Sequence, residues 1–406
     1  MMGLDQPDVT LSEQAIPGQS NALDSAVPLF IGYTQEGPTY SAVRINSFSD
    51  FEEAFGGPAV SAAILYYAVK LYFDNNGSGG FVLSLGDYDD LTDITADQLI
   101  TAFSDARVST AIATESSITL VAIPDMVLLD DADAVHWSQA WLSLLAICQA
   151  RQGVFGIVDT PDLADNASAC LNGFLSNHPA NPEWGAAYWP HLVTNYGEDG
   201  QDPIVVPPSA AVMAVIESTD RQSGVWKAPA NIALAQMVKP SQPWQQSDGL
   251  FQPSGASLNL IRSFPGRGTR VWGCRTLTSD ADSPWRYVQI RRLVAYIEAQ
   301  LSGIARHLIF ETNNAITWIK LKGLAHIGLR ELWLDGGLYG SEEQEAFYIQ
   351  IGLNETMTED DIRQGKIIMK VGVAVTYPAE FIVISLTFDT RMSLIRSSAD
   401  IAAETL

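Results

Sequence analysis

The sequence is poor in the residues that usually hold metals or build disulfide frameworks. Only three cysteines occur in 406 residues, Cys148, Cys170 and Cys274, and no two of them form a Cys-x-x-Cys pair. An odd number of widely spaced cysteines indicates neither a disulfide framework nor a zinc site. The five histidines are scattered, with no two of them three or four residues apart. We therefore predict no metal and no cofactor, and we expect the cysteines to be small buried apolar residues.

Long apolar runs are missing as well. The longest, residues 141–148 and 381–386, fall far short of the ~18 residues that a membrane-spanning helix needs. The first 20 residues contain three acidic residues, no lysine or arginine and no apolar block, which is not the pattern of a secretory signal. The sequence thus predicts no membrane insertion and a cytosol-like compartment of synthesis.

Basic residues are scarce, and their scarcity is uneven. The chain has 47 acidic and 23 basic residues, a net charge of -24, which argues against binding to nucleic acid. Residues 1–200 hold 26 acidic and 4 basic side chains, whereas residues 201–406 hold 21 and 19. Two surfaces with different partners or different exposure to solvent are therefore expected.

One stretch of the second half is locally basic. Seven arginines and no lysine fall within 31 residues: Arg262, Arg267, Arg270, Arg275, Arg286, Arg291 and Arg292. Two interpretations stay open for this arginine segment. It is either a solvated face with internal ion pairs, or a docking surface for an acidic partner, for which the planar guanidinium is well suited.

Five tryptophans in loop-like settings leave a similar choice between core packing and interface anchors. They are Trp184, Trp189, Trp226, Trp244 and Trp285.

Apolar periodicity predicts alternating helices and strands. In the first part of the chain the expected helices are 47–55, 61–73, 96–106, 138–149 and 209–219, and the expected strands are 27–34, 80–85, 118–123 and 154–158. This alternation is typical of an α/β layer with a mostly parallel sheet. Further along, the expected helices are 288–306 and 314–332, and the expected strands are 269–277, 346–353, 366–375 and 381–389. That part indicates an α+β unit.

No catalytic pattern stands out. The glycine-rich segments 266–269 and 336–340 lack the Lys-Ser/Thr that a phosphate-binding loop requires, and no G-x-S-x-G nucleophile elbow is present. Adjacent acidic pairs such as Asp89-Asp90 are expected by chance among so many carboxylates. An acidic α/β hydrolase-like enzyme without an identifiable active site remains the alternative function, and a tube or adhesin subunit is a further one.

Several short segments carry a family resemblance. The most specific are Pro265-Gly266-Arg267-Gly268, Val271-Trp272-Gly273-Cys274-Arg275-Thr276-Leu277, Trp285-Arg286-Tyr287-Val288, Phe310-Glu311-Thr312-Asn313-Asn314 and Tyr377-Pro378-Ala379-Glu380-Phe381-Ile382. Upstream, Phe30-Ile31-Gly32-Tyr33-Thr34 and Lys227-Ala228-Pro229-Ala230-Asn231 extend the series. In order and spacing these segments resemble the contractile tail sheath family of bacteriophages, tailocins and related injection systems, over most of residues 26–390.

The resemblance implies a structural protein and not an enzyme. It implies a subunit that polymerises helically around an inner tail tube and contracts to drive the tube through the target cell envelope. The implied partners are further copies of the chain, the inner tube protein, and the baseplate and tail terminator proteins. The implied location is a virion tail or an injection-system particle assembled in the bacterial host cytoplasm.

The resemblance also implies a multi-domain fold that combines α/β and α+β parts. The expected division is an N-terminal arm 1–25, a discontinuous inner α+β domain of 26–85 plus 255–385, an inserted outer α/β domain 86–254, and a C-terminal arm 386–406. Six arginines are expected to contact the tube or a neighbouring subunit: Arg267, Arg270, Arg275, Arg286, Arg291 and Arg292. The expected arm strands carry Val9, Leu11, Phe381, Ile382 and Ile384.

Overall fold

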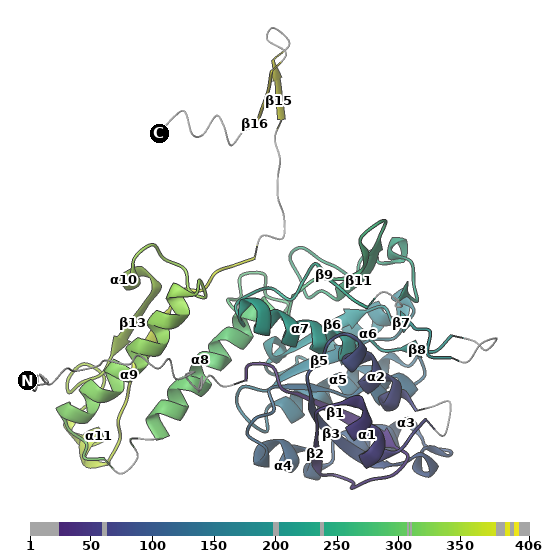
Figure 1. The fold of residues 1–406 in the computed structure, drawn as a ribbon, viewed down its shortest axis with the longest axis horizontal. Coiled ribbons are helices and arrows are strands. Elements are labelled where there is room, and N and C mark those ends of the chain that lie inside the picture. The colour runs from purple at the N-terminus through teal and green to yellow at the C-terminus, as the bar shows by residue number, and fades with distance from the viewer. Residues whose placement is uncertain are drawn as a thin grey trace, which may run out of the picture.

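The computed structural model describes most of the chain between residues 24 and 378. The described ranges are 24–58, 63–197, 203–235, 239–306, 308 and 311–378, with the backbones of 386–389 and 394–397. Two bodies lie side by side, a larger one built on a wide sheet and a smaller one built on two long helices (Figure 1). Helix α8 (Val288–Arg306) runs from the first body into the second.

A nine-stranded sheet forms the centre of the larger body, in the order β2-β3-β1-β4-β5-β6-β11-β12-β9. The strands are β1 (Pro28–Thr34), β2 (Ala42–Ile45), β3 (Gly80–Asp87), β4 (Leu120–Ala122), β5 (Phe155–Asp159), β6 (Gly185–Trp189), β9 (Ile232–Ala233), β11 (Asn259–Phe264) and β12 (Gly268–Trp272). Pairing is parallel from β3 to β11 and antiparallel at both edges. The predicted mostly parallel sheet is confirmed, because strands buried on both faces read as continuous apolar runs.

Helices cover both faces of this sheet. They are α1 (Phe48–Phe55), α2 (Ile64–Asp74), α3 (Ala96–Phe103), α4 (Ala106–Thr114), α5 (Ala134–Cys148), α6 (Ala164–Ser176) and α7 (Ser209–Ser223). Helices α2 and α7 pack against each other on one face, and α3, α4 and α6 gather around α5 on the other. Three short strands, β7 (Leu192–Val193), β8 (Val205–Val206) and β10 (Lys239–Pro240), form a small separate sheet.

Local sequence signals account for the ends of these helices. Ser47 accepts a hydrogen bond from the backbone N–H of Asp50 and so caps the start of α1. Gly56 ends the helix with φ 78°, a backbone conformation that glycine adopts without strain. Helix α8 has the bounds that periodicity predicted.

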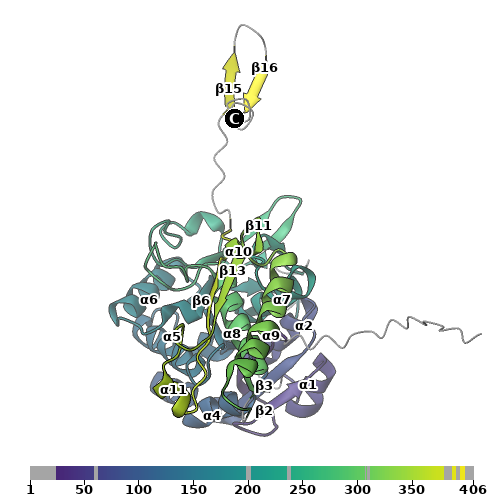
Figure 2. The same cartoon turned by 90° about the vertical axis from the view of Figure 1, so that its left-hand side faces the viewer.

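The smaller body has cores of its own. Helix α9 (Ala315–Leu334) packs on α8 and on the antiparallel pair β13 (Phe347–Gln350) and β14 (Lys370–Val373). The short helices α10 (Glu343–Ala346) and α11 (Glu359–Arg363) complete it (Figure 2). Its buried residues, among them Leu293, Leu329 and Phe347, form clusters separate from the large core. Strands β15 (Leu386–Asp389) and β16 (Leu394–Ser397) pair with each other.

The expected division into 26–85 plus 255–385 and an inserted 86–254 stays a prediction. Strands from both of these parts lie in the one central sheet. Strand β1 lies between β3 and β4, and residues of all three belong to the same core as Ile157 of β5. Residues 26–85 and 118–189 therefore share one sheet and one core. The boundary between cores falls inside α8, where Val288 belongs to the large core and Leu293 to the small one.

Candidate functional site

Arg275 is an internal residue of the larger body. Only 2% of it is exposed, and its Nη1 donates to the carbonyl oxygen of Gln252 at 2.6 Å. The guanidinium lies 4.2 Å from the centre of the Phe251 ring. This arginine therefore holds the loop 251–257 against the sheet and is not available as a docking residue.

Arg292 forms a buried ion pair that joins three segments. Its Nη2 lies 2.6 Å from Oδ2 of Asp220 on α7, and the two side chains are only 4% and 5% exposed. The same Nη2 donates to the carbonyl oxygen of Ser25, whose hydroxyl donates to Asp220. Helix α8, helix α7 and the entry into β1 are thus tied together at one point.

Arg291 and Arg286 are also engaged within the chain. The guanidinium of Arg291 lies between two indoles, 3.7 Å from the ring centre of Trp184 and 4.4 Å from that of Trp285. Its burial lowers the pKa of the guanidinium from its ordinary value. Arg286 donates to the carbonyl oxygens of Ala281 and Pro253. Trp184 and Trp285 therefore pack against Arg291 within the same chain.

The remaining arginines of the segment lie on or beside the β11–β12 hairpin. Arg267 is exposed and donates to the side chain of Asn231 at 3.2 Å, and Arg270 donates to the Asn231 carbonyl oxygen at 2.6 Å. Arg262 lies over the rings of Trp244 and Phe264. The structure thus divides the predicted docking surface, since it leaves Arg267 and Arg270 facing outward and uses Arg275, Arg291 and Arg292 internally.

The loop tryptophans divide in the same way. Trp189 is 1% exposed, Trp226 packs against the core of the smaller body, and Trp184 and Trp285 enclose Arg291. Trp244, 50% exposed, is the member of the set that resembles an interface anchor.

The smaller body presents two surfaces that a single chain leaves uncovered. Strand β13 pairs with β14, and within the described part of the chain no third strand joins either of them. Along α9, four apolar residues lie on one stripe and are 61–71% exposed: Ile316, Ile319, Ile327 and Leu334. Unpaired strand edges and an apolar helix stripe are features of association surfaces. Residue periodicity alone predicted the helix but not which of its faces is covered.

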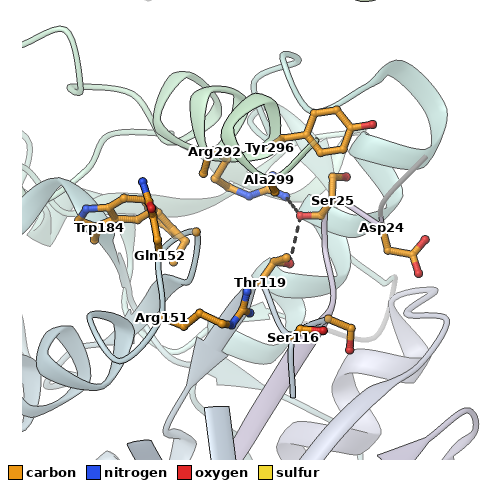
Figure 3. Close-up of a pocket in the computed structure, with 14 residues that line it drawn as sticks. Asp24, Ser25, Ser116, Thr119, Arg151, Gln152, Trp184, Arg292, Tyr296 and Ala299 are labelled. Atoms are coloured by element: carbon orange, nitrogen blue, oxygen red, sulfur yellow. Dashed lines mark hydrogen bonds between the residues drawn. The ribbon is translucent and has the colours of Figure 1, made fainter. Parts of the chain in front are cut away.

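The predicted arm residues Val9, Leu11, Phe381, Ile382 and Ile384 lie outside the described residues. The described chain begins at Asp24, beside a pocket of about 310 Å³ between the larger body and α8. Figure 3 shows Arg151 and Thr119 on one wall of this pocket and Arg292 and Ala299 of α8 on the opposite wall.

Two carboxyl groups with raised pKa values are buried and bind backbone N–H groups. Burial raises the pKa of Asp125 and of Asp159 to about 7, and each accepts a backbone N–H, from Tyr33 and from Ser209 respectively. All three cysteines are buried, as predicted. In the part of the chain that the structure describes, no cluster of His, Cys, Asp or Glu is arranged to hold a metal ion. Among the same residues, no helix is both long and apolar enough to cross a bilayer.

Comparison with known proteins identifies the family. Residues 280–389 match the model of the phage tail sheath C-terminal domain. A prophage major tail sheath protein of Pseudomonas aeruginosa, strain UCBPP-PA14, is 26% identical over 230 residues, and the match spans 55% of this chain and 55% of that relative. The tail sheath protein of Enterobacteria phage T4 is 27% identical over 117 residues, 28% of this chain and 17% of the phage protein. The chain thus spans about half, or less, of the curated relatives it matches.

Solved structures match over nearly the whole chain. A chain of the contracted baseplate of the anti-feeding prophage is 39% identical, with a TM-score of 0.83 over 96% of this chain and 100% of that chain. A chain of an extracellular contractile injection system, the PVC sheath complex in its contracted state, is 30% identical with a TM-score of 0.69, over 96% of this chain and 99% of that one.

The two curated relatives are named as sheath proteins and not as enzymes, so the hydrolase-like alternative is not supported. The identity and coverage of the solved structures, together with the C-terminal domain match, show that this chain belongs to the contractile tail sheath family.

Proposed function

We propose that the protein is a structural subunit of a contractile sheath, which polymerises helically around an inner tube and contracts to drive that tube through a target envelope. The observation that carries the proposal is the match, over 96% of the chain, to a contractile injection system's sheath complex in its contracted state. In this proposal the subunits also meet a baseplate at one end and a terminator at the other. The assembly is a virion tail or an injection particle built in the host cytoplasm.

Strand exchange through the terminal arms would link neighbouring subunits. The β13–β14 pair has no third strand among the described residues, and an added strand would supply main-chain hydrogen bonds whatever its sequence. The arm segments with Val9 and Leu11, and with Phe381, Ile382 and Ile384, have the apolar side chains that such strands bury. A head-to-tail contact of this kind does not close on itself, so it builds a filament.

The outward-facing arginines remain candidates for contact with the tube or with a neighbour. Arg267 and Arg270 form hydrogen bonds with Asn231 but no ion pair among the described residues. Exposed charge pairs are worth only about 0–1 kcal/mol each. A tube held by such contacts is retained in the resting sleeve and released when the sleeve changes shape.

No nucleotide is needed in this scheme. An extended sleeve that is kinetically trapped stores the work of contraction in subunit packing, and the barrier sets its lifetime. A calorimetric scan of extended sheaths is expected to show an exothermic conversion.

Electron microscopy of the purified protein, alone and co-expressed with its tube protein, tests the proposal. Hollow striated cylinders that shorten and widen under mild denaturant are the expected result. Removal of residues 1–20 is expected to leave the monomer folded and to abolish the cylinders. Monodisperse monomers or closed dimers under every condition would contradict the proposal.

A further inference from the structure

None of the functions discussed so far involves the pocket beside Asp24, where the described chain begins. It measures about 310 Å³ and opens between the larger body and α8 (Figure 3). Its apolar lining comes from Phe155 and Trp184 of the larger body and from Ala295 and Ala299 of α8. A cavity of this size and lining accepts two or three apolar side chains.

Arg151, on the wall of this pocket, has one unsatisfied hydrogen-bond donor. Nη2 of Arg151 donates to the carbonyl oxygen of Ile118, while its Nε is buried and has no hydrogen-bond acceptor. Within the described residues Arg151 belongs to no ion pair, whereas the neighbouring Arg292 is neutralised by Asp220. Burial lowers the pKa of Arg151, and the nearby carboxylate of Glu115 acts in the opposite direction. The pocket therefore suits an apolar group that also carries a carboxylate.

The N-terminal arm begins at the edge of this pocket. Asp24 and Ser25 are part of its lining, and Ser25 is fixed by hydrogen bonds to Arg292 and Asp220. The 23 residues before Asp24 are tethered to the pocket, which gives them a high effective concentration there.

The arm contains a turn signal at a distance from Asp24 that would let its first half fold back to the pocket. Pro17-Gly18 favours a reversal of the chain, and a two-residue reversal there places Leu11 level with Asp24. Residues two apart in an extended segment point to the same side. Val9, Leu11 and Glu13 would therefore present two apolar side chains and one carboxylate together.

We propose that in the unassembled subunit the chain's own segment 9–13 folds back into this pocket, with Leu11 among the apolar residues and Glu13 paired with Arg151. Assembly withdraws the segment, so that it is free to join a neighbour. The withdrawal rests on the proposed sheath function, whereas occupancy of the pocket does not. The docked arm delays polymerisation until a growing end competes for it.

A disulfide trap tests the occupancy. The pair Leu11→Cys and Ala295→Cys is oxidised in the full-length monomer and mapped by mass spectrometry, with little background because the three native cysteines are buried. Gln152→Cys, at the exposed rim, replaces Ala295→Cys if that variant does not fold. We expect at least a fivefold excess of the intrachain disulfide over a control pair of Leu11→Cys with Thr101→Cys, an exposed α3 residue outside the pocket.

Charge exchange supplies a second measurement. Arg151→Glu should reduce the disulfide yield several-fold, and the addition of Glu13→Arg should restore it. A yield no higher than the control, or a disulfide only between chains, would overturn the proposal, and the second result would assign the pocket to a neighbour's arm.

Polymerisation separates this inference from the sheath function. Ala299→Phe, which fills the pocket, should shorten the lag before cylinders form several-fold. An unchanged lag would refute the proposed delay. If the intrachain disulfide forms but no variant or wild-type protein makes cylinders, the sheath proposal fails while the docked arm stands.

Discussion

Arg292 and Asp220 form a two-pronged ion pair, with Nη1–Oδ1 at 3.1 Å and Nη2–Oδ2 at 2.6 Å, in a region where both side chains are about 95% buried. The pair connects the helix that enters the smaller body to helix α7 of the larger one. The carbonyl oxygen of Ser25 shares the same guanidinium. One contact thus fixes the position of the helix and the point from which the N-terminal arm departs.

Replacement of Arg292 by Met should strongly destabilise the protein. The substitution leaves Asp220 buried without its cation, and breaking a buried pair in this way costs about 3–5 kcal/mol. Urea unfolding followed by tryptophan fluorescence gives the change in the free energy of unfolding. Arg363→Ala is the control, because its pair with Glu359 is more than two-thirds exposed and is expected to contribute under about 1 kcal/mol. Equal effects of the two variants would contradict this interpretation.

The buried acids predict a particular pH dependence. Asp125 has a folded-state pKa of about 7, against about 3.9 in an unfolded chain. Between these values the folded protein holds a proton that the unfolded chain has lost. The stability that Asp125 contributes is therefore complete below about pH 4 and is lost as the pH rises to about 7, by up to about 1.4 kcal/mol per pH unit.

Asp125→Asn should flatten this decline. The amide oxygen can still accept the N–H of Tyr33, which the aspartate accepts at 2.6 Å, and the side chain no longer titrates. Unfolding free energies at pH 5, 6 and 7 measure the difference between variant and wild type. The control Asp248→Asn, at an exposed loop position, is expected to follow the wild type. A slope equal to that of the wild type would be evidence against a buried, protonated Asp125.

Replacement of two glycines by alanine should change the stability of the protein in opposite directions. At Gly32 a Cβ atom would lie 2.6 Å from Oδ2 of the buried Asp125, so Gly32→Ala should cost about 1–3 kcal/mol of stability. At Gly323, in the middle of α9, nothing lies within 4 Å, and alanine should stabilise the helix by up to about 1 kcal/mol. Thermal unfolding of the two variants beside the wild type checks both signs.

The outward-facing arginines should matter for assembly and not for folding. The double variant Arg267→Glu, Arg270→Glu removes two hydrogen-bond donors to Asn231 and no buried partner, so the melting temperature should change little. Sheath yield, scored by sedimentation and electron microscopy, should fall several-fold. Arg363→Glu, on the exposed helix α11, serves as the matched charge change. Normal cylinders from the double variant would remove these arginines from the assembly surface.

The sequence predicted local elements better than their arrangement. The bounds of α8 and the parallel character of the central strands follow from apolar periodicity and strand composition, which are properties of neighbouring residues. The domain boundaries depended on which strands pair, and β1 pairs with β3 and β4 at separations of about 50 and 90 residues. No pattern within the chain encodes those distances, so the division at residue 85 stays a prediction.

The arginine segment shows the same limit. Arg292 finds its carboxylate 72 residues away in α7, and Arg291 finds an indole in a different loop. A count of charges in a window cannot distinguish these arginines from Arg267, which remains at the surface. Strand β11 was not predicted either, although its hairpin partner β12 was, within a longer expected strand that the structure ends at Trp272.

The unequal size of the two cores has a mechanical meaning. The larger body buries an extensive apolar core around a continuous sheet, whereas the smaller body depends on smaller clusters of side chains and on a two-stranded sheet. Stiffness follows packing and strand pairing, so the smaller body is the compliant element of the subunit. In a lattice of linked copies, deformation would concentrate in the smaller bodies, while the larger bodies turn as rigid blocks. Under the proposed sheath function, a sleeve of such units would shorten by hinging and would keep each block folded throughout the stroke.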